Sequence, residues 1–311
     1  MYTDTTFARF KKIDAHTHIG AFGSPFNIHF DTERLLQQME TYKIERTILV
    51  ASGPHANEDT ASAFRAEPQK IIPLMWINCA EGKEAYDALE HYIRDEHFAG
   101  AKLQPLFDGY TADAPCVDPV AEICEAYGKP LFVHSGHPPF SLPWQIGLLA
   151  ERHPKLPMVM IHMGHAHGVY VDAAITMARR YENIWLETSG TSMSCQIANA
   201  YETVGHERVM FGIDSPFHHP TVEIQKVMAC GVNDEGLENI FYKIHGTEIK
   251  SRNRNEKERL LCKKLIPPDQ PVPAIPPWIW PSPASWPPWY SLERIFSRSP
   301  QPLATLTWET A

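Results

Sequence analysis

The sequence predicts a (β/α)8 barrel, a TIM-like fold, for most of the chain. Short apolar, β-branched runs recur along residues 1–250. They are roughly 25–34 residues apart, which is the length of one strand, one helix and their loops. Several runs, among them ERTILVAS, KPLFVHSG and LPMVMIHMG, lack polar alternation, as parallel strands buried on both faces do. Eight strand–helix units within about 250 residues match this barrel.

The elements follow one another in a regular order. The expected strands are centred near Asp14, Ile48, Pro73, Lys102, Phe132, Met160, Leu186 and Phe211. Apolar residues recur with helical periodicity in Thr32–Tyr42, in residues 118–127 and, after the last strand, in residues 236–243. A doubly wound open sheet is the alternative. Neither GxGxxG nor GxxxxGKS/T follows the first strand, so the nucleotide-binding form of that sheet loses its main support.

Residues 251–311 differ in composition from the rest of the chain. They contain 12 of the 27 prolines and 5 of the 8 tryptophans. Prolines recur every few residues from Leu265 to Tyr290. Proline removes a backbone donor and fixes φ, so we expect neither a helix nor a central strand in that segment. We place the folded domain at residues 1–250 and interpret 251–311 as a weakly structured tail. Two other hypotheses remain, a polyproline ligand for a partner domain and the product of a shifted reading frame.

Charge and composition exclude several classes of protein. The net charge of −9 argues against nonspecific nucleic-acid binding, which needs a basic surface. No apolar run approaches the ~20 residues of a membrane span, and residues 1–12 lack the apolar core of a signal peptide. The six cysteines form no CxxC pair, which argues against a disulfide scaffold and a thiolate zinc site. We expect a cytoplasmic protein without nucleic-acid or membrane partners, and a homodimer is left open.

Histidine and aspartate, which are common metal ligands, end several of the expected strands. Active sites of such barrels lie at these ends. The first strand ends in His16 and His18, which share a face because residues i and i+2 point the same way. The fifth strand ends at His134, the sixth at His162 and the eighth near Asp214. One strand-end histidine alone is more often a packing or hydrogen-bonding residue. Their coincidence at one rim predicts a site for a divalent metal.

Five segments together resemble the amidohydrolase superfamily: IDAHTHIG, GAKLQP, FVHSG, VMIHMG and FGIDSPF. More narrowly, they are similar to the amidohydrolase-related branch that includes aminocarboxymuconate semialdehyde decarboxylase and lactone hydrolases. The resemblance covers about residues 10–243. It implies a distorted (β/α)8 barrel with a divalent metal, usually zinc, and we expect a single Zn2+.

The resemblance also implies roles for individual residues. The metal ligands that it implies are His16, His18, His134 and Asp214. His162 corresponds to a sixth-strand histidine that contacts the metal-bound water or the substrate, so we predict that His162 and Asp214 are catalytic. Many members have His-x-Gly-Gly after the sixth strand, whereas this chain has HMGH, which is a departure from the family pattern.

Two reactions fit these residues. Bound zinc lowers the pKa of water to about 7. Asp214 can accept the proton, and His162 can stabilise charge or relay a proton. We therefore predict hydrolysis of an amide, lactone or related carbonyl bond in a small molecule. Decarboxylation of an aromatic or muconate-type acid is the alternative. We rank it second because no arginine lies at a strand end, where it could bind the substrate carboxylate. A third hypothesis is a non-catalytic binding protein that acts through the Pro-rich tail.

Four residues are predicted to contact the substrate. Trp76 ends the third strand, Lys102 lies on the fourth, and His137 and Trp144 belong to the loop after the fifth. Lys102 either binds a substrate carboxylate or, as in binuclear relatives, is carboxylated and bridges two metals. An aromatic rim suits a ring-shaped substrate, although strand-end aromatic residues are as often packing residues.

Overall fold

The computed structural model describes residues 8–165 and 167–243. The contacts of the chain divide it between Arg252 and Asn253, and all described residues belong to the first unit. The predicted domain boundary at residue 250 and the predicted tail over residues 251–311 lie outside the described residues, so both stay predictions.

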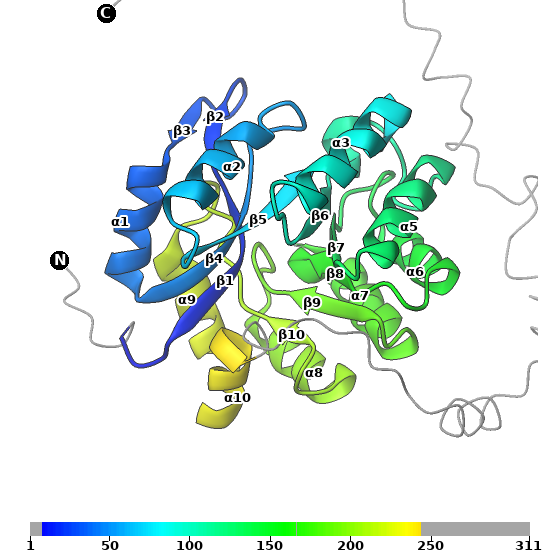
Figure 1. Cartoon of the computed structure of the whole chain (residues 1–311). Helices are drawn as coiled ribbons and strands as arrows, with labels where there is room; N and C mark the ends of the chain where they lie inside the picture. The colour runs from blue at the N-terminus through cyan, green and yellow to red at the C-terminus, as the bar shows by residue number, and fades with distance from the viewer. Residues whose placement is uncertain (1–7, 166, 244–311) are drawn as a thin grey trace, which may run out of the picture. The chain divides into compact units, whose positions relative to one another are not determined.

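Eight strands form one parallel sheet that closes into a barrel (Figure 1). The strands are β1 (Lys12–His18), β4 (Ile44–Val50), β5 (Ile71–Trp76), β6 (Gly100–Leu103), β7 (Leu131–His134), β8 (Met158–Ile161), β9 (Ile184–Glu187) and β10 (Val209–Met210), and each pairs with the next. Backbone hydrogen bonds from Ala15 N to Phe211 O (2.9 Å) and from Asp214 N to His16 O (2.6 Å) join the chain after β10 to β1. The predicted (β/α)8 barrel is confirmed, with a strand at each expected position.

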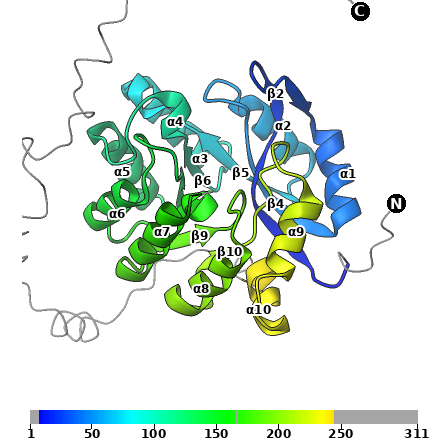
Figure 2. The same cartoon turned by 180° about the vertical axis from the view of Figure 1, so that it is seen from behind.

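Helices surround the strands (Figure 1, Figure 2). They are α1 (Thr32–Tyr42), α2 (Asn57–Ala66), α3 (Lys83–Arg94), α4 (Pro105–Asp108), α5 (Asp118–Ala126), α6 (Pro143–Arg152), α7 (Gly168–Arg180), α8 (Ser194–Val204), α9 (Pro220–Met228) and α10 (Asp234–Glu238), with short helical turns η1 (Cys79–Glu81), η2 (Pro115–Val117), η3 (His162–Gly164) and η4 (Asn239–Lys243). The helix α1 has the bounds that the periodicity predicts, and Asp31 caps it by accepting from Arg34 N at 2.9 Å. Within the described residues, no helix is both long and apolar enough to cross a membrane.

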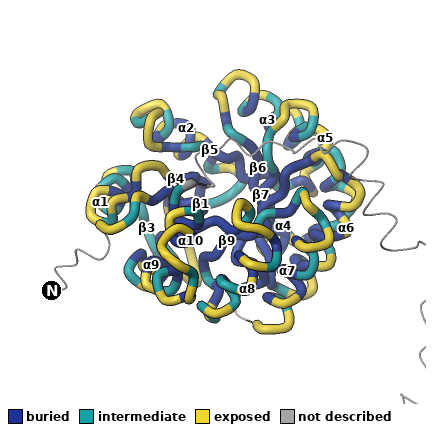
Figure 3. Tube along the Cα trace, turned by 90° about the horizontal axis from the view of Figure 1, so that it is seen from below, coloured by how far each residue is buried: buried dark blue, intermediate teal, exposed yellow. Residues whose placement is uncertain are grey.

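Both faces of the strands are buried, which explains their continuous apolar sequences. Ile48 and Val50 of β4 pack in one cluster with Leu74 and Phe132 from other strands. The intervening Leu49 belongs to a second, larger cluster that includes residues of the surrounding helices. Figure 3 shows the same division, with buried strands at the centre and exposed residues on the outer helices. This packed core holds the strand ends in place.

A hairpin that the sequence did not predict lies between β1 and α1. Its strands are β2 (Gly20–Phe22) and β3 (Ile28–Phe30), which pair antiparallel. Three-residue strands are too short to display a periodic pattern, so periodicity alone could not find them. The hairpin carries Phe22 and Phe26 to the same end of the barrel as the site described below.

The last described segment covers the junction between β1 and β10. Phe211 N donates to Ile240 O at 3.0 Å, and the Phe241 ring packs against the rings of Phe211 and Phe10 at 4.9 and 5.8 Å between centroids. The predicted final helix over residues 236–243 is therefore found as α10 followed by η4.

Candidate metal centre

A cavity of about 240 Å³ lies at the carboxyl ends of the strands. The histidines that line it are His16, His18, His134, His137, His162, His165 and His218. Its aromatic lining residues are Phe22, Phe26, Trp76, Phe107 and Phe217. Asp214 and Gln104 also face it. A cavity that gathers titratable groups at the strand ends of a barrel is the candidate functional site.

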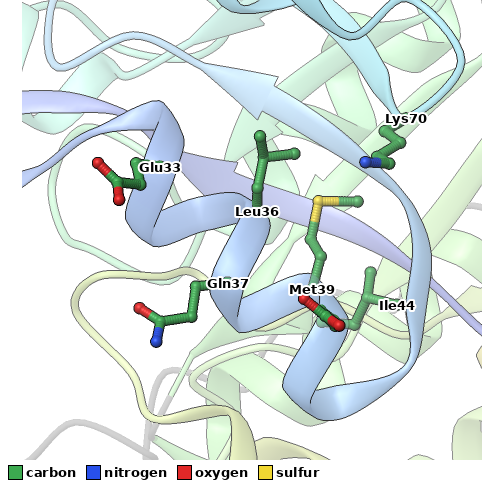
Figure 4. Close-up of a pocket in the computed structure, with 7 residues that line it drawn as sticks. Glu33, Leu36, Gln37, Met39, Ile44 and Lys70 are labelled. Atoms are coloured by element: carbon green, nitrogen blue, oxygen red, sulfur yellow. The ribbon is translucent and has the colours of Figure 1, made fainter.

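A second cavity, of about 560 Å³, has a different character. Figure 4 shows Leu36 and Met39 of α1 near Ile44, with Lys70 at the edge. Its charged side chains, such as Glu33 and Lys70, are exposed to solvent. Exposed charges are ordinary on a protein surface, so we assign the chemistry to the first cavity.

His16, His18 and Asp214 form a buried group that could hold a metal ion. Their ligand atoms all lie within 4.8 Å of one another, and each side chain is buried. The Asp214 Oδ1 atom is 3.5 Å from His16 Nδ1 and 3.6 Å from His18 Nε2. Two imidazoles and one carboxylate are donors that Zn2+ and related divalent ions accept. The barrel thus brings the ends of its first and last strands to one point.

Burial and hydrogen bonding prepare these imidazoles as ligands. Burial lowers the pKa of His18 to about 3 and lowers the pKa of His16 well below its usual value. Both rings therefore stay neutral and keep a lone pair for a cation. His18 Nδ1 donates to the Ala51 carbonyl at 3.0 Å, which leaves Nε2 unprotonated and close to Asp214. The donor set fits a divalent cation.

The backbone holds Asp214 in an unusual conformation with a φ of 61°. The left-handed region is costly for an aspartate and is often kept at functional sites. While Oδ1 faces His16 and His18, the Oδ2 atom lies 3.9 Å from His162 Nε2 and 3.8 Å from His218 Nε2. Burial raises the pKa of Asp214, and a bound cation would favour its ionised form instead.

His134 lies in the same cavity but outside the group of three. Its Nδ1 atom is 3.1 Å from Gln104 Nε2, and its Nε2 atom is 2.7 Å from His137 Nδ1. A second group of three possible ligands within the described residues contains His16, His162 and Glu187, and again lacks His134. The predicted role of His134 as a ligand therefore stays a prediction, since its Nε2 atom faces His137 and neither group of possible ligands includes it.

Lys102 is fully buried beside the metal group. Its Nζ atom is 3.1 Å from His16 Nε2 and 5.8 Å from the centre of the Trp76 ring. Burial lowers the pKa of Lys102 to about 8. Lys102 is not among the residues that line the cavity, so neither its predicted contact with a substrate nor its bridging of two metals is tested.

His162 keeps one ring nitrogen directed towards the cavity. Its Nδ1 atom is 3.0 Å from the Ser189 carbonyl oxygen and 2.9 Å from Ser189 Oγ. Donation from Nδ1 to the carbonyl leaves Nε2 as the atom that faces Asp214. This geometry suits the predicted catalytic role of His162, which stays a prediction.

Glu187 is a site residue that the sequence analysis missed. It is fully buried at the end of β9, and its Oε2 atom accepts from His162 N at 3.1 Å and from Ser189 Oγ at 2.7 Å. An added Cβ at Gly212 would collide with the Glu187 carboxylate, so glycine makes room for it. Glu187 ends its strand as the other site residues end theirs, and this position could have identified it.

The predicted substrate-contacting residues divide into two groups. Trp76 and His137 line the cavity, as expected. Trp144 does not: it is 42% exposed, and its ring packs edge-on against Tyr170 at 6.2 Å. A bridge between His137 and Ser141 turns the loop back before α6 begins at Pro143, so Trp144 falls in the first turn of that helix.

A buried chain of polar groups positions His218. Its Nδ1 atom is 3.2 Å from Glu223 Oε1, and Glu223 is only 2% exposed. Lys226 pairs with the same carboxylate and also donates to Thr188 O at 2.8 Å. The neighbouring His219 instead caps α9 by accepting from Thr221 N. Of the two adjacent histidines, only His218 therefore faces Asp214.

The barrel, the buried His–His–Asp group and the strand-end cavity define a class of protein: barrel enzymes that work with a divalent metal. Comparison with family models narrows this class, because residues 13–242 match the model described as amidohydrolase. The chain belongs to the amidohydrolase family, as the five sequence segments indicated.

Solved structures support the same fold. A 2,6-dihydroxybenzoate decarboxylase from Rhizobium has a TM-score of 0.61 at 17% identity, covering 77% of this chain and 98% of that one. A 5-carboxyvanillate decarboxylase from Novosphingobium aromaticivorans, complexed with manganese, has a TM-score of 0.63 at 15% identity, covering 78% and 96%. A TIM-barrel protein from Bordetella bronchiseptica has a TM-score of 0.63 at 18% identity, covering 83% and 100%.

Proposed function

We propose that this protein is a metal-dependent decarboxylase of a small aromatic carboxylic acid. The observation that carries the proposal is the shared cavity, in which the His16–His18–Asp214 group lies next to an aromatic wall. In that wall the Trp76 and Phe107 rings are stacked at 6.3 Å. Flat apolar walls with a few polar groups suit a planar ring that carries one charged end. The similar fold of two decarboxylases of aromatic acids supports this substrate class.

A single divalent cation, Zn2+ or Mn2+, would act as a Lewis acid that holds and polarises the oxygen atoms of the substrate. His16, His18 and Asp214 Oδ1 are the donors nearest to one another, and His134 is the predicted additional ligand. Imidazole and carboxylate donors suit zinc, whereas the manganese in the N. aromaticivorans structure supports the second choice.

The residues of this chain supply the proton that decarboxylation needs. Cleavage of the bond between the ring carbon and the carboxylate releases carbon dioxide and leaves an electron pair on that carbon, which must gain one proton. Asp214 Oδ2 faces His162 and His218 rather than the ligand imidazoles, so it is placed to deliver this proton. Asp214 must then regain a proton, and His218 Nε2, which lies 3.8 Å from the same oxygen, is placed to relay one from the cavity.

Hydrolysis of an amide or lactone is the second candidate function. It is favoured by the lining of the described cavity, which contains no arginine or lysine to hold a substrate carboxylate. In this reaction Asp214 accepts a proton from water instead of donating one, and the aromatic wall holds a ring-shaped lactone or amide.

Metal analysis followed by a substrate screen separates the two candidates. The purified protein would be loaded with Zn2+ or Mn2+ and incubated with hydroxylated benzoates, lactones and amides. We expect release of carbon dioxide from a hydroxybenzoate and about one metal ion per chain. Turnover of a lactone or amide without carbon dioxide would favour hydrolysis. A protein that binds no divalent metal would contradict both candidates.

The small-molecule substrate is the partner on which this proposal depends. The cytoplasmic location is part of the proposal and is supported by the described cysteines, which are all free thiols.

A further inference from the structure

Two cysteines far apart in the sequence lie side by side outside the metal centre. Cys79 Sγ is 3.3 Å from Cys116 Sγ, and both thiols are reduced. Cys79 begins η1 after β5, and Cys116 lies in η2 before α5. The other described cysteines, Cys124, Cys195 and Cys230, are also free thiols. We propose that Cys79 and Cys116 form a reversible, redox-controlled disulfide.

Contacts with Tyr86 hold the two cysteines next to each other. The Tyr86 hydroxyl from α3 lies 3.2 Å from the Cys79 carbonyl oxygen and 3.0 Å from the Cys116 carbonyl oxygen. One phenol thus ties the two backbones together at the point where the sulfurs meet. The sulfur atoms must approach by roughly 1.3 Å to reach bonding distance, which side-chain rotation can supply.

The two thiols differ in their access to an oxidant. Cys79 is fully buried, and burial together with the Cys116 sulfur raises the pKa of the Cys79 thiol far above its usual value. Cys116 is partly exposed, so its sulfur meets an oxidant first. With hydrogen peroxide, Cys116 becomes a sulfenic acid and one water leaves. The Cys79 sulfur then attacks the Cys116 sulfur, and the thiol proton and the hydroxide leave as a second water.

In total, two thiols and one hydrogen peroxide give one disulfide and two waters. Each sulfur loses one electron, and the peroxide accepts both. A dithiol reductant reverses the change by thiol–disulfide exchange. Reversible disulfides of this kind are compatible with a reducing compartment.

The disulfide would restrain the loops that carry the aromatic wall of the cavity. Trp76 ends β5 just before η1, and Phe107 lies in α4, between β6 and η2. Cys79 and Cys116 are 37 positions apart, so a cross-link would close a loop of that length. Closing such a loop restricts the unfolded chain and should raise the melting temperature by about 5 °C or more.

Peptide mapping of the full-length protein tests the proposal directly. The reduced protein is treated with a modest excess of hydrogen peroxide, free thiols are alkylated, and a tryptic digest is analysed by mass spectrometry. We expect the peptide with Cys79 to be joined to the peptide with Cys116, and the link to disappear after dithiothreitol. Oxidation of the exposed Cys195 shows that the peroxide has reacted with the protein. If Cys79 is still fully alkylated in that sample, the proposal is overturned.

Variants identify the second sulfur, because Cys116 and Cys124 lie on the same tryptic peptide. Cys116→Ser should abolish the cross-link, whereas Cys124→Ser and the exposed Cys195→Ser should keep it. A cross-link that survives in Cys116→Ser would contradict the assignment. The melting temperature should rise on oxidation of the natural protein and stay unchanged in Cys116→Ser. None of these measurements depends on catalytic activity, so they stand apart from the proposed function.

Discussion

At the scale of single residues, Asp214 connects His16 and His18 to His162 and His218. Its strained backbone directs Oδ1 to His16 and His18 and Oδ2 to His162 and His218. One carboxylate can therefore serve as a ligand through one oxygen and carry a proton on the other. The division between its two oxygens explains why a single acidic residue can hold two roles.

Replacing Asp214 by asparagine separates these roles. Asp214→Asn keeps the size and one oxygen, so we expect part of the metal binding to remain, whereas the amide cannot carry the proton. Turnover should fall by about 10²–10⁴-fold. Metal content and kcat are measured on the same preparation, with His219→Asn as the control because His219 caps α9 outside the cavity. Full activity in Asp214→Asn would refute its catalytic role.

Asp108 makes stability depend on pH. Its Oδ2 atom accepts from Trp76 Nε1 at 3.1 Å, and burial raises the pKa of Asp108 from 3.8 to about 6. A raised pKa means that the folded state favours the protonated acid, so stability is present below about pH 4 and is lost as pH rises through about 6.

Asp108→Asn removes this ionisation and keeps an acceptor for Trp76. Because Asp108 is partly exposed, we expect the variant to gain only about 1–2 kcal/mol over the natural protein at pH 8, with almost no gain at pH 4. Urea unfolding at both pH values measures the difference, and the exposed Asp59→Asn is the matched control. An equal effect at pH 4 and pH 8 would contradict the shifted ionisation.

At the scale of elements, the side chain of Asn57 supplies backbone hydrogen bonds at the end of β5. Trp76 N donates to Asn57 Oδ1 at 2.9 Å, and Asn57 Nδ2 donates to Trp76 O at 2.9 Å and to Pro54 O at 2.8 Å. The buried Asn57 at the start of α2 thus takes the place of a strand neighbour at the end of β5. This link fixes the position of the Trp76 backbone in the cavity wall.

Asn57→Ala should therefore loosen the end of β5. It leaves two carbonyls and one amide without their partner in a buried position, and we expect a loss of about 2–4 kcal/mol in the free energy of unfolding. Denaturant unfolding measures the loss. Asn199→Ala, an exposed position in α8, should change stability by less than about 0.5 kcal/mol. Similar losses in the two variants would exclude a special role for Asn57.

At the scale of the whole molecule, the barrel closes within the first of the two units of the chain. β1 is joined to the segment after β10, and η4 covers that junction. In the sequence, the stretch from β1 to the start of α9 contains the residues of the metal group, the cavity and the cysteine pair. The site is thus assembled by ring closure and uses residues from both ends of the barrel sequence.

A chain that ends at Arg252 tests whether the remaining residues matter for the barrel. We expect it to keep its metal content and to melt within about 2 °C of the full chain, because the described contacts that form the site lie before residue 244. Differential scanning fluorimetry and metal analysis compare the two chains. Loss of partner binding, with no hydrolase or lyase activity found in the full chain, would support the non-catalytic binding hypothesis for the tail. Loss of metal from the shortened chain would contradict a barrel that folds without residues 253–311.

Sequence patterns were enough to predict the barrel and the order of its strand ends. Continuous apolar runs reveal buried parallel strands, and the topology of a barrel then brings their ends to one rim, so His16, His18 and Asp214 could be placed together. Ring orientation and loop direction depend instead on contacts between distant segments. Such contacts in the folded chain turn His134 towards His137 and place Trp144 in α6, outside the cavity.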